Sequence, residues 1–290
     1  MTDFSYAEMT TRNRGFVTEV EQERLRQARI FIPGVGGMGG AAFMSLLRAG
    51  VGRFAIADID SFEVSNLNRQ LFANLDTIGR SKAEAARDAA LRINPEVRIE
   101  LLGAKWTDEV DRLVRESAVV VNGMDDAAAG VHLYRRSKVH GRTVIDAYAS
   151  PLPSVTRVGP DAPRPEERLG YPTVGTEWRD ISPEMRAQCL MLEIEYVLTN
   201  SSSHRYVDLE IAGDVAAGRR SRFSFATMVT MAGTMMAEEA LRVVLDRPGG
   251  TDHRGWFFNP HAGKVENPVP APLAAVKRLL VRRFMRKFLV

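Results

Sequence analysis

The sequence is poor in cysteine and in long apolar runs. Cys189 is the single cysteine of the 290-residue chain, so neither an internal disulfide framework nor a zinc site built from cysteines can form within it. No run of about 18 apolar residues is present, and Met1 to Glu21 lacks the apolar core of a secretion signal. We therefore expect a cytoplasmic protein with no membrane span and no zinc.

Charge of one sign is not in large excess either. The chain carries 39 Lys and Arg against 36 Asp and Glu, a net charge of +3, which falls short of the dense basic surface of a dedicated nucleic-acid-binding protein. This mild excess suits small anionic ligands such as nucleotides. Hydrophobic residues make up 45% of the chain, which is enough apolar material for one sizeable core with a modest extension.

The first half of the chain alternates short apolar runs with segments of helical period, a pattern typical of a parallel sheet with crossover helices. Strands are expected near Ala28–Pro33, Arg53–Ile59, Val97–Leu102, Ala118–Asn122 and Thr143–Ala147. Helices are expected at Gly39–Ala49, Lys82–Ile93, Asp108–Arg115 and Ala127–His140. The predicted fold class is α/β, with a Rossmann-like, doubly wound, mainly parallel sheet.

The second half of the chain has a different composition and pattern. Six prolines and three glycines between residues 151 and 175 favour a loop or flap. The remaining pattern predicts helices at Pro183–Leu198 and Ser224–Leu245, and the second of these is expected to be buried and to close the core. It also predicts a strand-like segment at Tyr206–Ile211 and a hairpin at Trp256–Phe258 and Lys264–Glu266. These elements predict a C-terminal α+β extension.

The last segment, residues 273–290, places leucine and phenylalanine among lysine and arginine at helical spacing. This pattern predicts a basic amphipathic helix. Such a helix can dock on its own domain, on a partner or on an anionic surface. Plain docking is favoured, because a membrane-surface role requires more than a basic stripe.

A glycine-rich loop follows the first expected strand and precedes a helix: Gly34-Val35-Gly36-Gly37-Met38-Gly39-Gly40. Glycines let the backbone turn sharply and approach a phosphate, while a helix N-terminus presents free amide donors and partial positive charge. The candidate cofactor-binding residues here are Gly34, Gly36, Gly37 and Gly39. By itself the loop also fits a nicotinamide or flavin oxidoreductase.

Charged residues after the second strand separate these alternatives. Asp58 and Asp60 end that strand. Asp58 stands 24 residues after Gly34, about where an acidic residue binds a ribose hydroxyl in oxidoreductases and in ATP-binding enzymes alike. Arg69 follows in the next loop, and Lys82 opens the next helix. A dehydrogenase has no evident use for two cations there, whereas a reaction that builds charge on a triphosphate needs them.

The ordered set of Gly-x-Gly-Gly-x-Gly, Asp-x-Asp, Asn-x-x-Arg-Gln, Lys and a later Asp resembles the ThiF/MoeB/HesA family of ubiquitin-activating-enzyme-like adenylyltransferases, over roughly residues 10–150. The resemblance implies ATP and Mg²⁺ as cofactors. It implies that Asp58 holds ribose, that Asn66, Arg69 and Gln70 contact phosphates, and that Lys82 is catalytic. Asp125 is implied as the magnesium ligand, with Asp126 as the alternative.

The same resemblance implies a homodimer in which an N-terminal arginine enters the partner's active site. Arg14 is the better match and Arg12 the second. The chain then divides into an N-terminal helical arm (1–27), an ATP-binding adenylation core (28–150), a crossover flap and substrate region (151–223), a closing helix with a hairpin (224–272) and the basic helix (273–290). Many relatives carry two Cys-x-x-Cys pairs that bind zinc, which are absent here.

The function predicted is ATP-dependent adenylation of a carboxylate, with release of pyrophosphate. The substrate expected is a peptide or a small ubiquitin-like or sulfur-carrier protein. An RNA modification like that of tRNA threonylcarbamoyl-adenosine dehydratase is less favoured, because one short basic helix is thin evidence for tRNA binding. A non-catalytic nucleotide-binding partner subunit is a further alternative. Cys189 is a candidate nucleophile for a thioester step, although a lone cysteine on an apolar helical run usually only packs against its apolar neighbours.

Overall fold

The computed structural model describes residues 4–216 and 219–286, and it contains one eight-stranded sheet in the order β3-β2-β1-β4-β5-β6-β7-β8. The strands that pair in parallel are β1 (Arg29–Pro33), β2 (Arg53–Ala57), β3 (Arg98–Leu102), β4 (Val119–Val121) and β5 (Val144–Asp146). The antiparallel strands are β6 (Ser154–Val158), β7 (Trp256–Asn259) and β8 (Lys264–Glu266). The predicted doubly wound, mainly parallel sheet with an α+β extension is confirmed.

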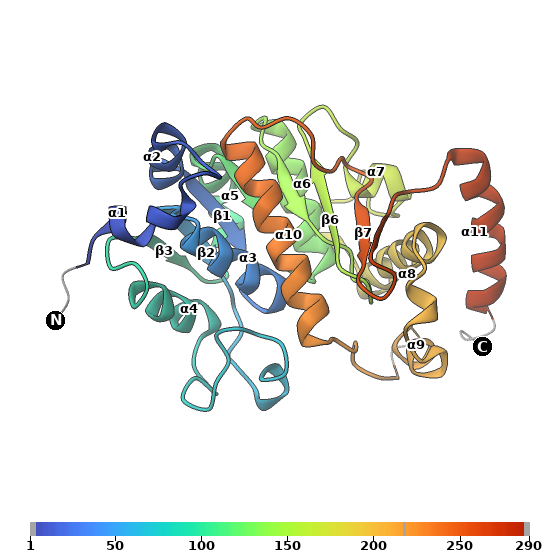
Figure 1. Cartoon of the computed structure of the whole chain (residues 1–290). Coiled ribbons are helices and arrows are strands. Elements are labelled where there is room, and N and C mark those ends of the chain that lie inside the picture. The colour runs from blue at the N-terminus through green and yellow to red at the C-terminus, as the bar shows by residue number, and fades with distance from the viewer. Residues whose placement is uncertain (1–3, 217–218, 287–290) are drawn as a thin grey trace.

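Helices cover both faces of this sheet (Figure 1). The sequence of β1 assigns the two sides, because successive side chains in a strand point in opposite directions. Ile30 and Ile32 lie in one apolar cluster, and Phe31 lies in the other. The first cluster includes residues of α3 (Gly37–Arg48), α4 (Lys82–Leu91) and α10 (Ala226–Val244). The second includes residues of α5 (Trp106–Glu116) and α6 (Ala127–Val139).

The closing helix α10 packs directly on α3. A Cβ added to Gly233 would lie 2.4 Å from the carbonyl oxygen of Met38 and 2.6 Å from the Cβ of Ala41. The two backbones therefore approach more closely than any larger residue at position 233 would permit. This contact fixes α10 against the helix that begins at the glycine-rich loop.

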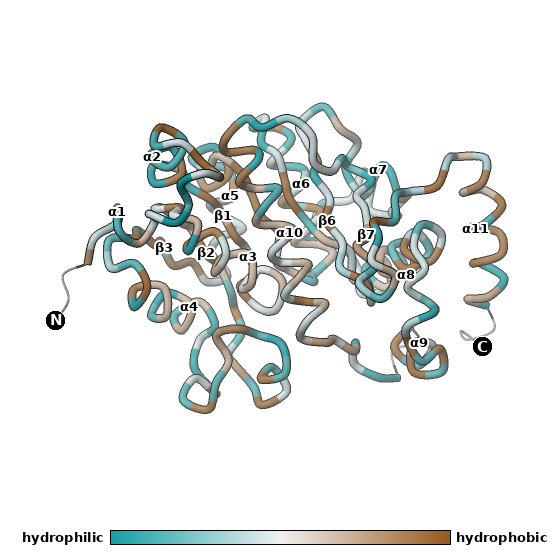
Figure 2. The backbone as a smooth tube through the Cα atoms, in the orientation of Figure 1, coloured by the Kyte–Doolittle hydropathy of each residue, from teal (hydrophilic) through white to brown (hydrophobic). Residues whose placement is uncertain are grey.

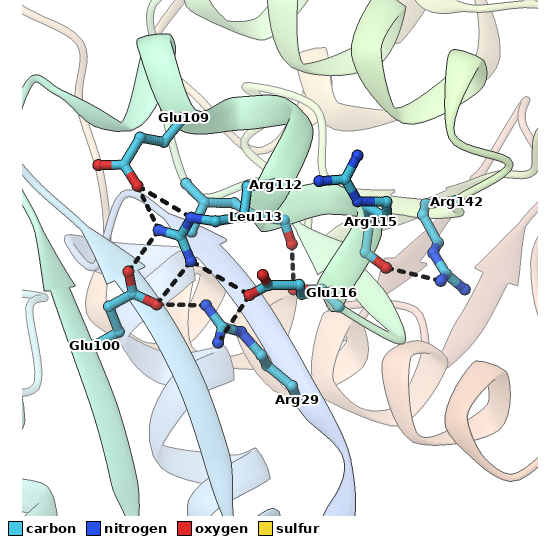
Figure 3. Close-up of polar contacts among 9 residues, drawn as sticks. Arg29, Glu100, Glu109, Arg112, Leu113, Arg115, Glu116 and Arg142 are labelled. Carbon is cyan, nitrogen blue, oxygen red and sulfur yellow. Dashed lines mark hydrogen bonds and ion pairs between the residues drawn. The ribbon is translucent and has the colours of Figure 1, made fainter.

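An ionic network on the α5 face ties β1 and β3 to α5 (Figure 3). Arg29 pairs with Glu100 of β3 and lies 3.2 Å from Glu116 of α5. Arg112 lies 2.7 Å from Glu100 and 3.2 Å from Glu116. These guanidinium groups, Arg112 first, lower the pKa of Glu100 below its ordinary value.

The N-terminal arm consists of α1 (Tyr6–Met9), a 3₁₀ turn η1 (Thr11–Asn13) and α2 (Glu19–Gln27). Thr18 and Glu21 form a reciprocal capping box that starts α2. Tyr6 donates a hydrogen bond of 2.6 Å to the carbonyl oxygen of Gly50, just beyond the C-terminus of α3. The arm is thereby anchored at the end of α3 opposite the glycine-rich loop.

Two local expectations for the second half are wrong. The segment Tyr206–Ile211 is not a strand. It follows η4 (Ser203–Arg205) and leads into α9 (Leu209–Ala216), because Asp208 accepts hydrogen bonds from the amides of Glu210 and Ile211 in the manner of an N-cap. The proline-rich stretch, which was expected to be a loop or flap, contains two regular elements. They are β6, which pairs with β5, and α7 (Pro165–Leu169), which has its proline at the helix start.

The remaining elements are η2 (Val64–Asn66), η3 (Trp178–Asp180), α8 (Pro183–Asn200) and α11 (Ala271–Arg286). The predicted helix over α8, the closing helix and the hairpin are confirmed. The expected C-terminal helix is present as far as Arg286, and its last residues, 287–290, lie outside the described residues. Across the described ranges, no helix is both long enough and apolar enough to cross a membrane.

Candidate nucleotide-binding site

The glycine-rich loop joins the end of β1 to the start of α3. Gly34 has φ +83°, a conformation that favours glycine, and a Cβ there would lie 2.5 Å from the backbone of Gly123. A Cβ on Gly39 would lie 1.9 Å from the carbonyl oxygen of Gly34. The loops that follow β1 and β4 are therefore in backbone contact at the N-terminus of α3, where helix amides can receive an anion.

Asp58 lies directly beneath this loop at the end of β2. Its carboxylate accepts hydrogen bonds from the amide of Val35 at 2.9 Å and from the amide of Asp60 at 3.0 Å. Burial raises the pKa of Asp58, an effect that these hydrogen bonds oppose. The carboxylate is thus fixed in place beside the loop, with lone pairs left to accept from a further donor.

Lys82, the first residue of α4, is nearly buried. Its ammonium lies 2.9 Å from a carboxylate oxygen of Asp60, and the side chains of Lys82 and Asp60 are 10% and 62% exposed. The structure therefore brings Asp58, Asp60 and Lys82 together, while their roles in binding stay a prediction. It also shows that the charge of Lys82 is already paired with Asp60.

The loop after β2 brings Gln70 over the glycine-rich loop. A Cβ on Gly36 would lie 3.6 Å from both terminal atoms of the Gln70 side chain. Gln70 is 8% exposed, and its side-chain oxygen has no hydrogen-bond partner among the described residues. An unpaired buried acceptor is costly, so this amide suits a ligand that supplies a donor.

Asn66 and Arg69 belong to the same loop but serve different contacts. Asn66 is buried, and its side-chain oxygen accepts a hydrogen bond of 3.1 Å from the amide of Glu63, which shapes the loop. The guanidinium of Arg69 donates to the carbonyl oxygen of Ser65 at 2.9 Å and to Asn68 at 2.8 Å. Both contacts use the same nitrogen, Nη1, and the other guanidinium N–H groups of Arg69 have no partner in the part of the chain that the structure describes.

Asp125 and Asp126 have distinct surroundings in the loop after β4. Asp126 caps α6 by accepting a 2.7 Å hydrogen bond from the amide of Ala129, and it also pairs with Arg186 of α8. Asp125 is exposed and makes no hydrogen bond or ion pair with any residue that the structure describes. Of the two, Asp125 is the carboxylate free to bind a cation.

One partly buried carboxylate at this edge of the sheet was missed by the sequence prediction. Asp146, at the end of β5, accepts hydrogen bonds from Asn122 at 2.8 Å, from the hydroxyl of Tyr134 at 2.8 Å and from the amide of Ala147 at 2.7 Å. Burial raises the pKa of Asp146 to about 7. Its position at the carboxyl end of an expected strand was the only available signal.

Arg14 is not near the glycine-rich loop of its own chain. It pairs with Glu19 at 3.2 Å, and both side chains are exposed, at 68% and 83%. The neighbouring Asn13 donates to the carbonyl oxygen of Ala49 at the opposite end of α3. Arg12 is likewise exposed in this segment. A role for either arginine in a partner subunit stays a prediction.

Cys189 lies on α8 and is 1% exposed. Burial, followed by the carboxylates of Glu166 and Glu193, raises the pKa of its thiol to about 11. The thiol is therefore protonated at neutral pH, which does not suit a nucleophile.

Among the described residues, no cluster of three or more His, Cys, Asp or Glu side chains could hold a metal ion.

Residues 10–273 match the ThiF family. The chain belongs to this family. It is 38% identical over 134 residues to the molybdopterin-synthase adenylyltransferase of Salmonella typhimurium, an alignment covering 44% of this chain and 53% of that protein. It is 40% identical over 93 residues to ubiquitin-like modifier-activating enzyme 5 of Caenorhabditis elegans, covering 32% and 22%. The chain thus spans about half the length, or less, of these relatives.

Solved structures resemble this ThiF-family chain in fold. A structure of PaaA has a TM-score of 0.62 at 19% identity, covering 93% of this chain and 86% of the other. The structure of E. coli MccB with ATP has a TM-score of 0.62 at 16% identity, covering 86% and 66%. E. coli TcdA, a tRNA N6-threonylcarbamoyladenosine dehydratase, scores 0.59 at 17% identity, covering 83% and 95%. At these identities the likeness concerns the fold alone.

Proposed function

We propose that this ThiF-family protein is an ATP-dependent adenylating enzyme that transfers AMP to a carboxylate of a peptide or protein. The observation that carries the proposal is the arrangement around Gly36. Asp58 is fixed below the loop through the amide of Val35, and the unpaired amide oxygen of Gln70 lies above it. A nucleotide offers ribose hydroxyls as donors and phosphates as acceptors for the amides at the start of α3.

The charged residues would act on the phosphates. Arg69 has guanidinium N–H groups without a partner among the described residues. Lys82 is held at the site by Asp60, so a bound phosphate would compete with Asp60 for the ammonium. The exposed, unpaired carboxylate of Asp125 suits a hard cation such as Mg²⁺. Magnesium bound there would offset negative charge on the triphosphate.

The chemistry requires no general base. A carboxylate is already ionised at pH 7, so one of its oxygens can attack the α-phosphorus of ATP directly. The new carboxyl O–P bond forms as the bond between the α-phosphorus and the bridging oxygen breaks, and pyrophosphate leaves with the electron pair. Arg69, Lys82 and the α3 amides would stabilise the charge that builds on the transferred group.

The names of the relatives support a peptide or protein substrate. Besides the two above, a sulfur carrier protein adenylyltransferase of Thermus thermophilus is 36% identical over 106 residues, covering 36% of this chain and 39% of that protein. We further propose a cytoplasmic homodimer in which Arg14 completes the partner's site, because Arg14 is exposed and distant from its own chain's glycine loop.

ATP–pyrophosphate exchange tests this function. A pool of synthetic peptides with free C-terminal carboxylates is the probe, and the same pool with amidated C-termini is the matched control. We expect exchange with the free acids and none with the amides. Titration with ATP and NADH in parallel provides a second measurement. Tight binding of NADH with no binding of ATP would contradict the proposal and support an oxidoreductase instead.

A further inference from the structure

The C-terminal helix α11 stands at one end of the molecule, beside α8 (Figure 1). Its attachment to α8 includes two ion pairs to one carboxylate. Arg282 lies 2.8 Å from Glu195 of α8, and Arg278 lies 3.4 Å from the same carboxylate. None of the residues of α11 in the described range is fully buried. The predicted docking on its own domain therefore covers one side of the helix and leaves the other uncovered.

The uncovered side of α11 carries an apolar stripe, which consists of Leu273, Val276, Leu279 and Leu280. These side chains are 49%, 58%, 69% and 64% exposed. Residues three, four and seven positions apart lie on one side of a helix, so the four side chains form a continuous surface. Figure 2 shows hydrophobic and hydrophilic segments alternating along α11, as this spacing requires.

Positive charges border the apolar stripe. Lys277 falls between Leu273 and Leu280 in helical spacing, and Arg283 follows Leu279 and Leu280 by one turn. Lys277, Arg283 and Arg286 form no ion pair with any residue that the structure describes. The sequence from Asn267 to Val290 contains no acidic residue. The surface is therefore apolar along its centre and positively charged at its edges.

We propose that this surface of α11 docks on an anionic lipid bilayer. Leucine and valine side chains can enter the boundary between headgroups and acyl chains while long cationic side chains reach the lipid phosphates. Membrane attachment here is peripheral, because no described helix is suited to cross a bilayer. The proposal concerns a surface outside the nucleotide site and does not depend on the adenylation reaction.

Two other occupants fit less well. A second copy of α11 would bring Lys277, Arg283 and Arg286 against identical cations with no acidic side chain on either helix, and like charges repel. A peptide or protein helix usually binds in an apolar groove formed by several elements. This stripe instead consists of exposed side chains of a single helix, and that helix lies at the edge of the molecule (Figure 1), where a planar bilayer can reach it.

Vesicle co-sedimentation of the full chain tests the proposal. The probes are vesicles of phosphatidylglycerol mixed with phosphatidylcholine, and vesicles of phosphatidylcholine alone. We expect at least about tenfold stronger binding to the anionic vesicles, decreasing as salt is added, because cations near such a surface each strengthen binding several-fold. Equal binding to both kinds of vesicle, or none, would overturn the proposal.

Two paired variants test the apolar stripe and its cationic border in turn. Val276→Asp with Leu280→Asp removes the centre of the stripe, and Lys277→Glu with Arg283→Glu reverses its border; each pair should lower anionic-vesicle binding at least about tenfold. The matched controls are Val20→Asp, at an exposed residue of α2, and Arg92→Glu, at the exposed residue just after α4; both should bind like the parent. Thermal melting establishes that every variant is folded.

The variants also distinguish the competing occupants. If both α11 pairs bind vesicles as well as the controls do, general basic charge explains the binding and the proposal is wrong. If light scattering shows that the Val276→Asp and Leu280→Asp pair lowers the oligomeric state while lipid binding stays unchanged, the stripe is an interface between copies. Loss of lipid binding at an unchanged oligomeric state is the result that supports a bilayer.

Discussion

The side-chain amide nitrogen of Asn122 donates a hydrogen bond of 2.8 Å to the carboxylate of Asp146, joining the ends of β4 and β5. The side-chain oxygen of Asn122 accepts a hydrogen bond of 3.2 Å from the backbone amide of Met124, the residue before Asp125. Asp146 thereby supports the loop that presents the proposed magnesium ligand, although it does not touch that ligand itself.

The raised pKa of Asp146 predicts a pH-dependent stability. Because its pKa is about 7 in the folded protein against an ordinary 3.8, the neutral carboxyl is favoured in the folded state. Its stabilising contribution is complete below about pH 4 and is lost as the pH rises through about 7. Asp146→Asn should therefore gain stability relative to the parent over this range, by on the order of 3 kcal/mol.

Urea unfolding at several pH values measures this gain, with Asp161→Asn, which changes an exposed carboxyl, as the control. A constant difference in the free energy of unfolding between the parent and Asp146→Asn from pH 4 to pH 7 would show that Asp146 is ionised like any surface aspartate.

Replacement of Asp125 should lower activity, whereas replacement of Asp126 should lower stability. Asp125→Ala is expected to lower ATP–pyrophosphate exchange at least about a hundredfold, as is Lys82→Ala, because each removes a preorganised electrostatic contact. Asp126→Ala is expected to lower the free energy of unfolding by about 1 kcal/mol through loss of the α6 cap. Exchange assays and urea unfolding of the three variants check this; near-normal exchange by both Asp125→Ala and Lys82→Ala would remove the assignment.

The proposed action of Arg14 across a dimer can be tested by complementation. Arg14→Ala and Lys82→Ala should each be inactive alone. After mixing and exchange of subunits, half of the dimers carry one intact site, so about a quarter of the parent activity should return. No recovery, together with a strictly monomeric active parent, would show that Arg14 does not act in trans.

The close approach at the glycine-rich loop predicts the effect of a single methyl group. Gly39→Ala would place a Cβ 1.9 Å from the carbonyl oxygen of Gly34, so the loop must shift. We expect at least about tenfold weaker ATP binding and a loss of stability of about 1–3 kcal/mol, the usual cost of overpacking. Gly103→Ala is the matched control, because its Cβ would meet nothing within 4 Å. Equal ATP affinity in both variants, measured by calorimetry, would contradict the close approach.

Much of the candidate nucleotide-binding site could be predicted because it is built from short segments at strand ends. Parallel strands bring their carboxyl ends to one edge of the sheet, so Gly36, Asp58 and the loop before Asp125 had to be near one another once the strands were recognised. The helix around Gly233 was recognisable from its apolar circumference. These features depend on patterns within about twenty residues of chain, which periodicity and glycine placement express.

Other features were decided by contacts between distant segments. The sequence left Asp125 and Asp126 as alternatives, and Arg186, sixty residues away, engages Asp126 while Asp125 stays unpaired. Asp146 became notable only when Asn122 and Tyr134 surrounded it. A strand signal at Tyr206 failed because an N-cap aspartate started a helix instead.

By itself, then, the sequence determined the alternation of strands and helices and the glycine loop, because local backbone conformation and side-chain periodicity follow from neighbouring residues. Tertiary structure alone decided that Lys82 is paired with Asp60, that Arg14 lies far from its own chain's loop, and that α11 keeps an apolar stripe exposed. Burial and charge pairing depend on which remote surfaces meet, and no local pattern encodes that meeting.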